Sequence, residues 1–221
     1  MPARRIRKTY GSISGALSAK TGSLVRFESA LERDLYILLD FAECVATYEE
    51  QPVTIGWVDH LGKARLYTPD VLISFKGGTV RFLGRSAMKP WLVEVKYRSY
   101  LAKPDPNFRE RLLAGIRYAA QSGFYFRVLT ERDIRIPSLP NLTFLRRYLH
   151  YNLDERSRNA ITHAIQTGCC TVSEVLQSMS TDKVQQGRTL PGIWHLIAVG
   201  SLSADLDQPL SNATEVALGE V

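Results

Sequence analysis

The most constraining feature of this chain is the segment 91–97, where two charged residues interrupt an apolar run. Large apolar side chains alternate there with Leu92, Glu94 and Lys96, the period-two pattern of a β-strand with two unlike faces. Glu94 and Lys96 therefore project on the same side, about 7 Å apart along the strand. A carboxylate and an ammonium on a core strand are costly unless they pair or bind a metal. The segment predicts one of these two arrangements.

A second acidic residue stands at the start of another apolar strand. Asp70 follows Pro69 and precedes the apolar segment 71–75. If this strand neighbours the first, Asp70 and Glu94 converge on one cation, and oxygen ligands suit magnesium or manganese. Such an ion activates a water toward a phosphodiester, and Lys96 can neutralise charge in the transition state. The alternative is an ordinary cross-strand ion pair on a solvated face, with Asp70 in a turn.

Composition and charge narrow the class of protein. The 221 residues are 45% hydrophobic and 23% charged, as in an ordinary soluble globular protein. The formal net charge of +6 favours a polyanionic partner such as nucleic acid. No apolar run reaches the roughly 20 residues that span a bilayer, so no membrane partner is expected. Three cysteines without zinc spacing fit a reducing cytoplasm.

The first 25 residues are predicted to form a basic N-terminal arm. Residues 1–20 contain no acidic side chain and are rich in serine and glycine. The composition is typical of a nucleic-acid-binding arm, and also of an organellar transit peptide or a solubilising tail. The basic residues expected to contact DNA are Arg4, Arg5, Arg7 and Lys8.

A helix is expected over about 28–41, because apolar residues recur there at helical spacing. Glu28 and Glu32 share its polar face, and a helix-borne carboxylate would complete a metal site. The other interpretation is a capping box that begins at Ser29, in which Glu32 only satisfies a backbone amide. The pattern by itself favours the capping box.

The remaining pattern predicts an α/β protein with a mixed sheet flanked by helices, followed by a small winged-helix-like domain. Strands are expected at 53–58, 65–75 and 79–83, and a helix over 108–120 leads to a parallel strand at 124–130. A short helix at about 142–149 closes this part. Helices are then expected at about 156–167, 172–179 and 188–199, with a hairpin in the tail. The alternative for the last third is a helical extension with a disordered tail.

The order of these motifs resembles the TnsA family, the restriction-endonuclease-like subunit of heteromeric cut-and-paste transposases. The resemblance rests on Phe-Glu-Ser-Ala-Leu-Glu-Arg-Asp at 27–34, Glu-Glu-Gln-Pro at 49–52, the Pro-Asp at 69–70 and Glu-Val-Lys at 94–96. It implies that Glu32 is the helix-borne active-site acid, Asp70 the central metal ligand, Glu94 a second ligand and Lys96 the catalytic lysine. Some members carry glutamine in place of Glu94. Glu28 is placed outside the site, and Gln51 is near it without an assigned role.

The resemblance also implies an activity and partners. A PD-(D/E)xK endonuclease domain is expected at 26–150 and a partner-binding, winged-helix-like domain at 151–221. The implied protein uses Mg²⁺, with Mn²⁺ as a substitute, to cut the 5′ ends of a transposon in double-stranded DNA in the bacterial cytoplasm. It would act with a TnsB-type transposase and, through its C-terminal domain, with a TnsC-type ATPase. Further DNA contacts are predicted on the second helix at Arg109, Arg111 and Arg117.

Two other functions stay open from the sequence. One is a stand-alone restriction or repair endonuclease of the same fold, which would cleave naked DNA without partners. The other is a non-catalytic DNA-binding adaptor that uses the C-terminal domain as a winged helix.

Overall fold

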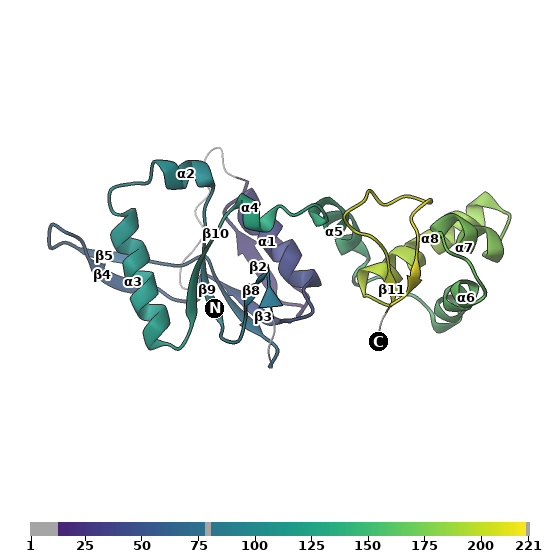
Figure 1. The fold of residues 1–221 in the computed structure, drawn as a ribbon, viewed down its shortest axis with the longest axis horizontal. Helices are drawn as coiled ribbons and strands as arrows, with labels where there is room; N and C mark the ends of the chain where they lie inside the picture. The colour runs from purple at the N-terminus through teal and green to yellow at the C-terminus, as the bar shows by residue number, and fades with distance from the viewer. Residues whose placement is uncertain (1–12, 78–80, 220–221) are drawn as a thin grey trace. The chain divides into compact units, whose positions relative to one another are not determined.

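The computed structural model describes residues 13–77 and 81–219. The chain divides into two compact units, which meet in sequence between Ile136 and Pro137. The first unit contains all four residues of the predicted active site, and the second contains the helices of the last third (Figure 1).

A four-stranded mixed sheet forms the centre of the first unit. Its strand order is β10 (Tyr125–Leu129), β9 (Trp91–Val95), β6 (Val71–Phe75) and β3 (Val45–Glu50). Strand β9 is parallel to β10 and antiparallel to β6, and β6 is antiparallel to β3. All five residues of β9 are buried, which confirms the core strand expected from the alternating pattern. The predicted mixed sheet is therefore present, and β9 lies inside it.

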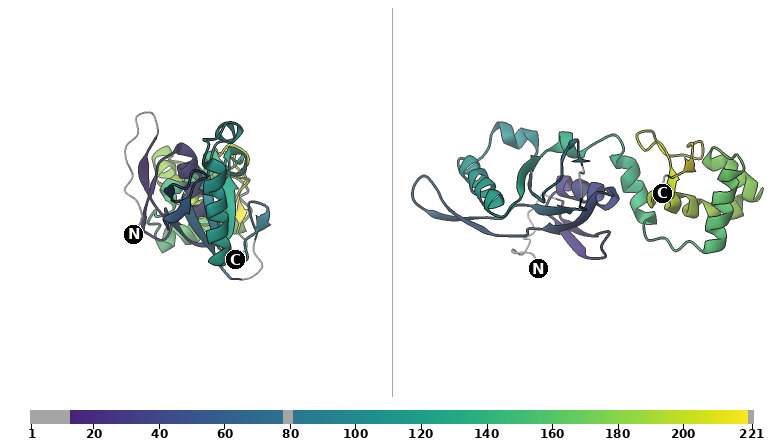
Figure 2. Two further views of the ribbon diagram at one scale, coloured as in Figure 1. Left: turned by 90° about the vertical axis from the view of Figure 1, so that its left-hand side faces the viewer. Right: turned by 60° about the horizontal axis from the view of Figure 1, so that its bottom comes forward.

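Helices α1 (Ala30–Phe41) and α3 (Phe108–Gln121) cover opposite faces of this sheet (Figures 1 and 2). On the α3 side, Ala114 and Ala119 pack in one apolar cluster with Leu92 of β9. Helix α3 follows the short α2 (Arg98–Ala102) and provides the crossover that joins the parallel strands β9 and β10. The short helix α4 (Glu131–Ile134) follows β10. Glu94 belongs to the α3 side, because it lies two residues after Leu92 in the strand.

The prediction of one continuous strand at 65–75 is wrong. The chain instead forms β5 (Ala64–Tyr67), which pairs with β4 (Ile55–Val58) as a separate hairpin, and then β6 in the main sheet. The interruption falls at Thr68 and Pro69, and proline has no N–H to continue a ladder. Asp70 therefore lies immediately before β6, where the chain enters the central sheet. Of the strand predicted at 79–83, residues 79–80 lie outside the described residues, and β7 (Arg81–Phe82) pairs with β8 (Arg85–Ser86).

Part of the predicted N-terminal arm belongs to the folded unit. Strands β1 (Gly15–Ser18) and β2 (Leu24–Phe27) form an antiparallel hairpin. Lys20 lies in the turn between these two strands. Its Nζ donates hydrogen bonds to the carbonyls of Ala42 and Val45, at 2.8 and 2.6 Å. Residues 15–25 therefore belong to the folded hairpin, which contradicts the prediction of an arm that extends to residue 25. Arg4, Arg5, Arg7 and Lys8 lie outside the described residues.

The second unit begins earlier than the predicted boundary after residue 150. Helix α5 (Leu139–Leu145) and the 3₁₀ turn η1 (Arg146–Tyr148) contact α8 (Lys183–Ala198). Phe144 packs edge-on against Trp194 with ring centroids 5.6 Å apart, and Nδ1 of His195 lies 2.8 Å from the carbonyl oxygen of Tyr148. These contacts assign the short helix predicted at 142–149 to the second unit rather than to the nuclease domain.

The rest of the second unit contains the predicted elements in the predicted order. Helices α6 (Glu155–Gln166) and α7 (Val172–Met179) precede α8, and β11 (Leu202–Ser203) pairs with β12 (Ala217–Leu218). Thr171 caps α7 in a capping box with Glu174. Helix α8 begins five residues before the predicted 188, where Asp182 accepts a hydrogen bond from the N–H of Val184. Within residues 13–77 and 81–219, none of the helices combines the length and apolar character needed to cross a bilayer.

Candidate active site

Asp70 is fixed by backbone hydrogen bonds on both sides. Its N–H donates to the carbonyl of Val93 at 3.0 Å, and its carbonyl accepts from the N–H of Gln51 at 2.9 Å. The Oδ2 atom accepts from the N–H of Val95 at 2.6 Å. Gln51 adopts a φ of 44°, in the left-handed region that non-glycine residues rarely occupy. The carboxylate of Asp70 is therefore held against the end of β9, the strand that carries Glu94 and leads into Lys96.

Glu94 is a buried carboxylate with a partner on each oxygen. Only 3% of the residue is exposed. Its Oε1 lies 2.8 Å from Nζ of Lys96, and its Oε2 accepts a 2.6 Å hydrogen bond from the hydroxyl of Tyr67. Burial, and then the negative charge of Asp70, raise the pKa of Glu94 to about 7, although Lys96 and Tyr67 act in the opposite direction. The ionised form of Glu94 is therefore disfavoured unless a cation stands beside it.

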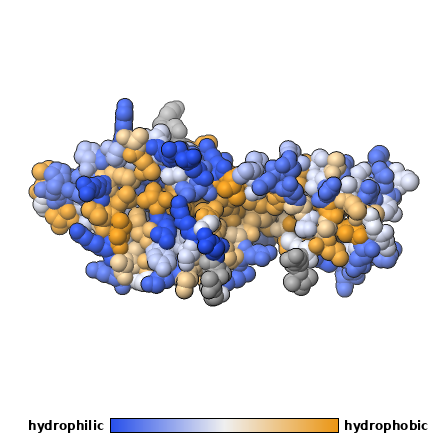
Figure 3. All heavy atoms as spheres, viewed as in Figure 1, coloured by the Kyte–Doolittle hydropathy of each residue, from blue (hydrophilic) through white to orange (hydrophobic). Residues whose placement is uncertain are grey.

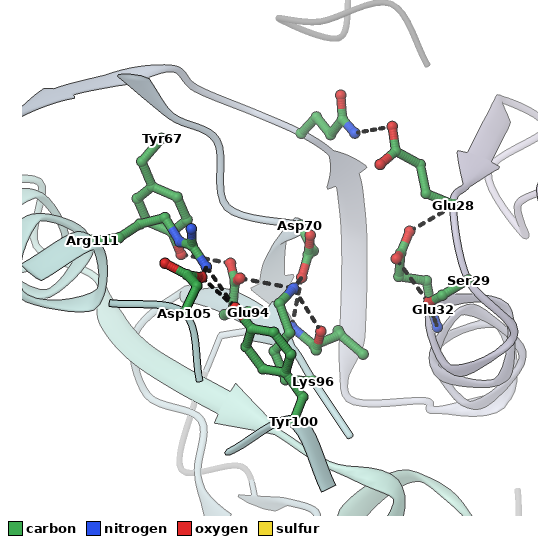
Figure 4. A network of polar contacts seen from close by, with 12 residues as sticks. Glu28, Ser29, Glu32, Tyr67, Asp70, Glu94, Lys96, Tyr100, Asp105 and Arg111 are labelled. Atoms are coloured by element: carbon green, nitrogen blue, oxygen red, sulfur yellow. Dashed lines mark hydrogen bonds and ion pairs between the residues drawn. The ribbon is translucent and has the colours of Figure 1, made fainter. Parts of the chain in front are cut away.

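The ammonium of Lys96 is the cation on which the oxygens of the site converge. Nζ lies 2.8 Å from Oε1 of Glu94, 3.0 Å from the carbonyl oxygen of Val95 and 3.5 Å from Oδ2 of Asp70. Burial by itself would lower the pKa of Lys96, but the charges of Asp70 and Glu94 outweigh it and raise the pKa above the usual value. The raised pKa keeps Lys96 in its ammonium form. Figure 4 shows the side chain with its partners.

Glu32 makes the contacts expected of a capping side chain at the start of α1. Its oxygens accept hydrogen bonds from the N–H of Glu28 and from the hydroxyl of Ser29, both at 2.8 Å, while Ser29 caps α1. Burial, followed by the negative charge of Asp70, raises the pKa of Glu32 to about 7. The capping side chain is thus electrostatically coupled to the carboxylates of the sheet. Figure 4 shows it on the opposite side of Asp70 from Glu94.

The oxygen atoms of the site fit a hard cation such as magnesium, but the three predicted ligands do not all lie together. Carboxylate and carbonyl oxygens are the atoms such ions bind, and those of Asp70, Glu94 and Val95 already surround a positive charge. Across residues 13–77 and 81–219, however, no group of three or more acidic, histidine or cysteine side chains lies close enough to hold a metal. Asp70 and Glu94 both contact the ammonium of Lys96, and Glu32 does not form a three-residue group with them.

Two protein-family models match the chain. The model described as TnsA-like endonuclease N terminal matches residues 42–131, and that described as TnsA endonuclease C terminal matches residues 133–206. The chain belongs to the TnsA family. Comparison with curated proteins gave no match. Membership places the chain among the DNA endonucleases of transposition.

The TnsA matches agree with the architecture in two ways. The N-terminal match contains Asp70, Glu94 and Lys96, whereas Glu32 lies before it. The two matches meet near residue 132, close to the unit boundary between Ile136 and Pro137. The N-terminal match thus ends well before residue 150.

Several residues beside the TnsA site were not predicted from the sequence. Tyr67 contacts Glu94 directly, and Arg111 lies over the Tyr67 ring at 5.9 Å from its centroid. Arg111 also forms an ion pair with Asp105 at 3.1 Å, and Asp105 accepts a hydrogen bond from Tyr100. An aromatic residue two positions before a Pro-Asp pair was the available sign for Tyr67. Its partner, however, is separated from it by 27 positions.

The basic residues predicted on α3 are not equivalent in this TnsA protein. Arg109 and Arg117 are exposed, whereas Arg111 is half-buried and engaged with Asp105. Apolar residues share the exposed surface, since Leu113 is 41% and Ile116 is 47% exposed, and Figure 3 shows apolar and hydrophilic residues together over α3. An open cavity of about 730 Å³ lies between α3 and hairpin β4–β5, and neither Asp70 nor Glu94 lines it.

Proposed function

We propose that this protein is a metal-dependent DNA endonuclease that cuts the 5′ ends of a transposon during cut-and-paste transposition. The observation that carries the proposal is the convergence of oxygens from Asp70, Glu94 and Val95 on the ammonium of Lys96. The carboxylates of this site outnumber its single ammonium, and two of them have a raised pKa. Such an arrangement is completed by an added positive charge.

Each residue has a defined part in this proposal. Asp70 and Glu94 hold Mg²⁺, or Mn²⁺ in its place, and Glu32 approaches as a third acidic group. When bound, the ion lowers the pKa of an attacking water and withdraws charge from the scissile phosphate. Lys96 would supply the ammonium that stabilises the charge developing on the phosphate.

DNA affinity in this proposal comes mainly from contacts to phosphates. Arg109 and Arg117 are exposed on α3, and Arg111 adds a guanidinium next to the site. Contacts of this kind position a duplex without reading its sequence and weaken as salt increases. Recognition of the transposon-end sequence is therefore assigned to a TnsB-type transposase partner.

The second unit is proposed to bind a partner protein, a TnsC-type ATPase. A winged-helix adaptor would read bases with its third helix, α8. Trp194 and His195, in the second half of α8, are only 4% and 7% exposed, whereas Lys183, Gln185 and Arg188 in its first half are exposed. Burial therefore excludes only Trp194 and His195 from base reading, and the proposed protein partner follows from membership of the TnsA family.

Manganese titration by calorimetry tests the metal site without requiring partners. We expect saturable binding to the wild type, loss of that binding in Asp70→Ala, and unchanged binding in Asp207→Ala, which removes an exposed carboxylate of the second unit. The absence of binding in all three proteins would contradict a preformed site.

Cleavage in the reconstituted assembly tests the role in transposition. With both partners present, cuts at the 5′ ends should depend on Asp70 and Lys96, and the isolated chain should be nearly inactive. Efficient cleavage of naked DNA by the isolated chain would instead support a stand-alone nuclease.

A further inference from the structure

Tyr67 contacts Glu94 of the proposed metal site and has no role in the function described so far. Its hydroxyl donates to Oε2 of Glu94, while Oε1 of the same carboxylate faces Lys96 (Figure 4). We propose that Tyr67 is a positioning residue that fixes the orientation of Glu94, so that Oε1 is presented to the cation of the site. This inference rests on the proposed function, because it assigns Glu94 to cation binding.

The first support is the burial of both groups. Tyr67 is 4% and Glu94 is 3% exposed, and their oxygens are 2.6 Å apart, a short hydrogen bond to a carboxylate. The terminal torsion of a glutamate has broad, two-fold preferences, so a single contact does not define the carboxylate plane. Contacts at both oxygens, Tyr67 on Oε2 and Lys96 on Oε1, do define it.

The second support is that the Tyr67 ring is itself held in place. Its strand register is set by pairing with Ile55 in hairpin β4–β5. Helix α3 closes the other side through Gly115, where an added Cβ would lie 2.9 Å from Cε1 of Tyr67. The guanidinium of Arg111 lies over the ring, 5.9 Å from its centroid. A side chain confined in this way can pass its position on to Glu94.

The consequence is that α3 and hairpin β4–β5 determine the geometry of a metal ligand that neither element carries. Hydrogen-bond partners of metal ligands typically change metal affinity or activity about 10–100-fold when they are removed. Tyr67→Phe removes only the hydroxyl and retains the ring that packs in the core. We therefore expect a specific defect at the metal site and a folded protein.

A matched control is available in the same unit. The hydroxyl of Tyr48 donates to Oδ1 of Asp40 at 2.7 Å, and this bond is also buried. Asp40 lies eight residues after Glu32 in α1, about 12 Å along the helix axis. Tyr48→Phe thus removes a similar phenol–carboxylate bond away from the proposed site.

The experiment compares Mn²⁺ affinity and thermal unfolding of the full-length wild type and both variants. We expect Tyr67→Phe to weaken Mn²⁺ binding about tenfold or more and Tyr48→Phe to leave it unchanged. Both variants should lower the unfolding midpoint by a few degrees. In the reconstituted assembly, Tyr67→Phe should lower kcat and leave KM for DNA unchanged. Equal Mn²⁺ affinity in the three proteins would overturn the positioning role.

A crystal structure of Tyr67→Phe separates this inference from the proposed function. We expect Glu94 to rotate, so that its Oε1 no longer contacts Nζ of Lys96. A carboxylate that stays in place would overturn the inference even if the wild type binds and uses the metal. A wild type that binds no Mn²⁺ would contradict the proposed function, and the orientation of Glu94 in the variant would then decide the role of Tyr67.

Discussion

Oδ2 of Asp34 lies 3.1 Å from Nε of Arg135, a residue 101 positions further along the chain. Asp34 stands two residues after Glu32 in α1 and is 5% exposed. Arg135 also donates to the hydroxyl of Tyr97 at 3.1 Å, and Tyr97 follows Lys96 directly. This connection joins the helix that carries Glu32 to the end of the strand that carries Lys96.

The first prediction concerns this connection. Asp34→Ala removes the acceptor of Arg135 and of the neighbouring Arg33, so we expect the free energy of unfolding to fall by about 2 kcal/mol. Glu43→Ala is the control, because this exposed carboxylate lies just beyond the end of the same helix. It should change the stability by less than about 0.5 kcal/mol. Denaturant unfolding measures both values, and equal effects would refute a connection specific to Asp34.

The second prediction concerns pH. The pKa of Glu94 is raised to about 7 in the fold. Between the ordinary pKa of a glutamate and that value the folded state binds more protons than the unfolded state, so its stability decreases as pH rises. The contribution is fully present below the ordinary pKa and lost above about 7. In the absence of divalent ions, we expect a loss on the order of 2 kcal/mol from this group across that interval.

Glu94→Gln tests that contribution, because an amide cannot ionise. Urea unfolding of this variant between pH 4.5 and pH 8, a range set about the raised pKa of Glu94, should show a flatter profile than the wild type. Glu43→Gln should retain the wild-type slope. A profile for Glu94→Gln as steep as that of the wild type would show that Glu94 is not the responsible group.

The third prediction separates the arginines of α3. Arg117→Ala should reduce the slope of log K against log salt for DNA binding by about one, the effect of one lost phosphate contact. Arg111→Ala should change this slope less, because Asp105 already neutralises Arg111 at 3.1 Å. Fluorescence anisotropy across a salt series, with the same duplex throughout, measures both slopes. The same slope in wild type and Arg117→Ala would remove Arg117 from the interface.

The fourth prediction compares two helical glycines. An added Cβ at Gly115 would lie 2.6 Å from Cε2 of Phe126, whereas at Gly187 it would meet nothing within 4 Å. Gly115→Ala should therefore destabilise the first unit by about 1–3 kcal/mol through overpacking. Gly187→Ala should stabilise α8 by about 0.5–1 kcal/mol, since alanine is the better helix former. Thermal unfolding of each variant tests these opposite signs, and two shifts of the same sign would be inconsistent with the prediction.

The residues of the candidate site were recognisable because their patterns are local. Alternation around Glu94 and Lys96 and the Pro-Asp step at Asp70 each indicate a strand, whereas the pairing of the two strands was a condition that no local pattern supplies. Glu32 was predictable as a cap for the same reason. Its coupling to Asp70 depends on the docking of α1 on the sheet, which no local pattern describes.

Other features required contacts that are distant in sequence. Strand β3 was missed because its register shifts between Val45 and Thr47, so its buried residues do not alternate regularly. The unit boundary was misplaced because the apolar face of α5 does not indicate that its partner is α8. Tyr67 was missed because its hydrogen bond to Glu94 exists only after hairpin β4–β5 folds over α3.

The burial of several charges around Lys96 has a consequence for how such proteins change over generations. The site is held at the expense of stability, because ionised Glu94 is less favourable in the fold than in the unfolded chain. In the proposed function, a substitution that neutralises Glu94 would weaken the metal site and leave the chain folded, and protein quality control removes chains chiefly when they unfold. Copies weakened at this position should therefore persist as well-folded proteins, still able to occupy the place of the fully active subunit in the proposed assembly.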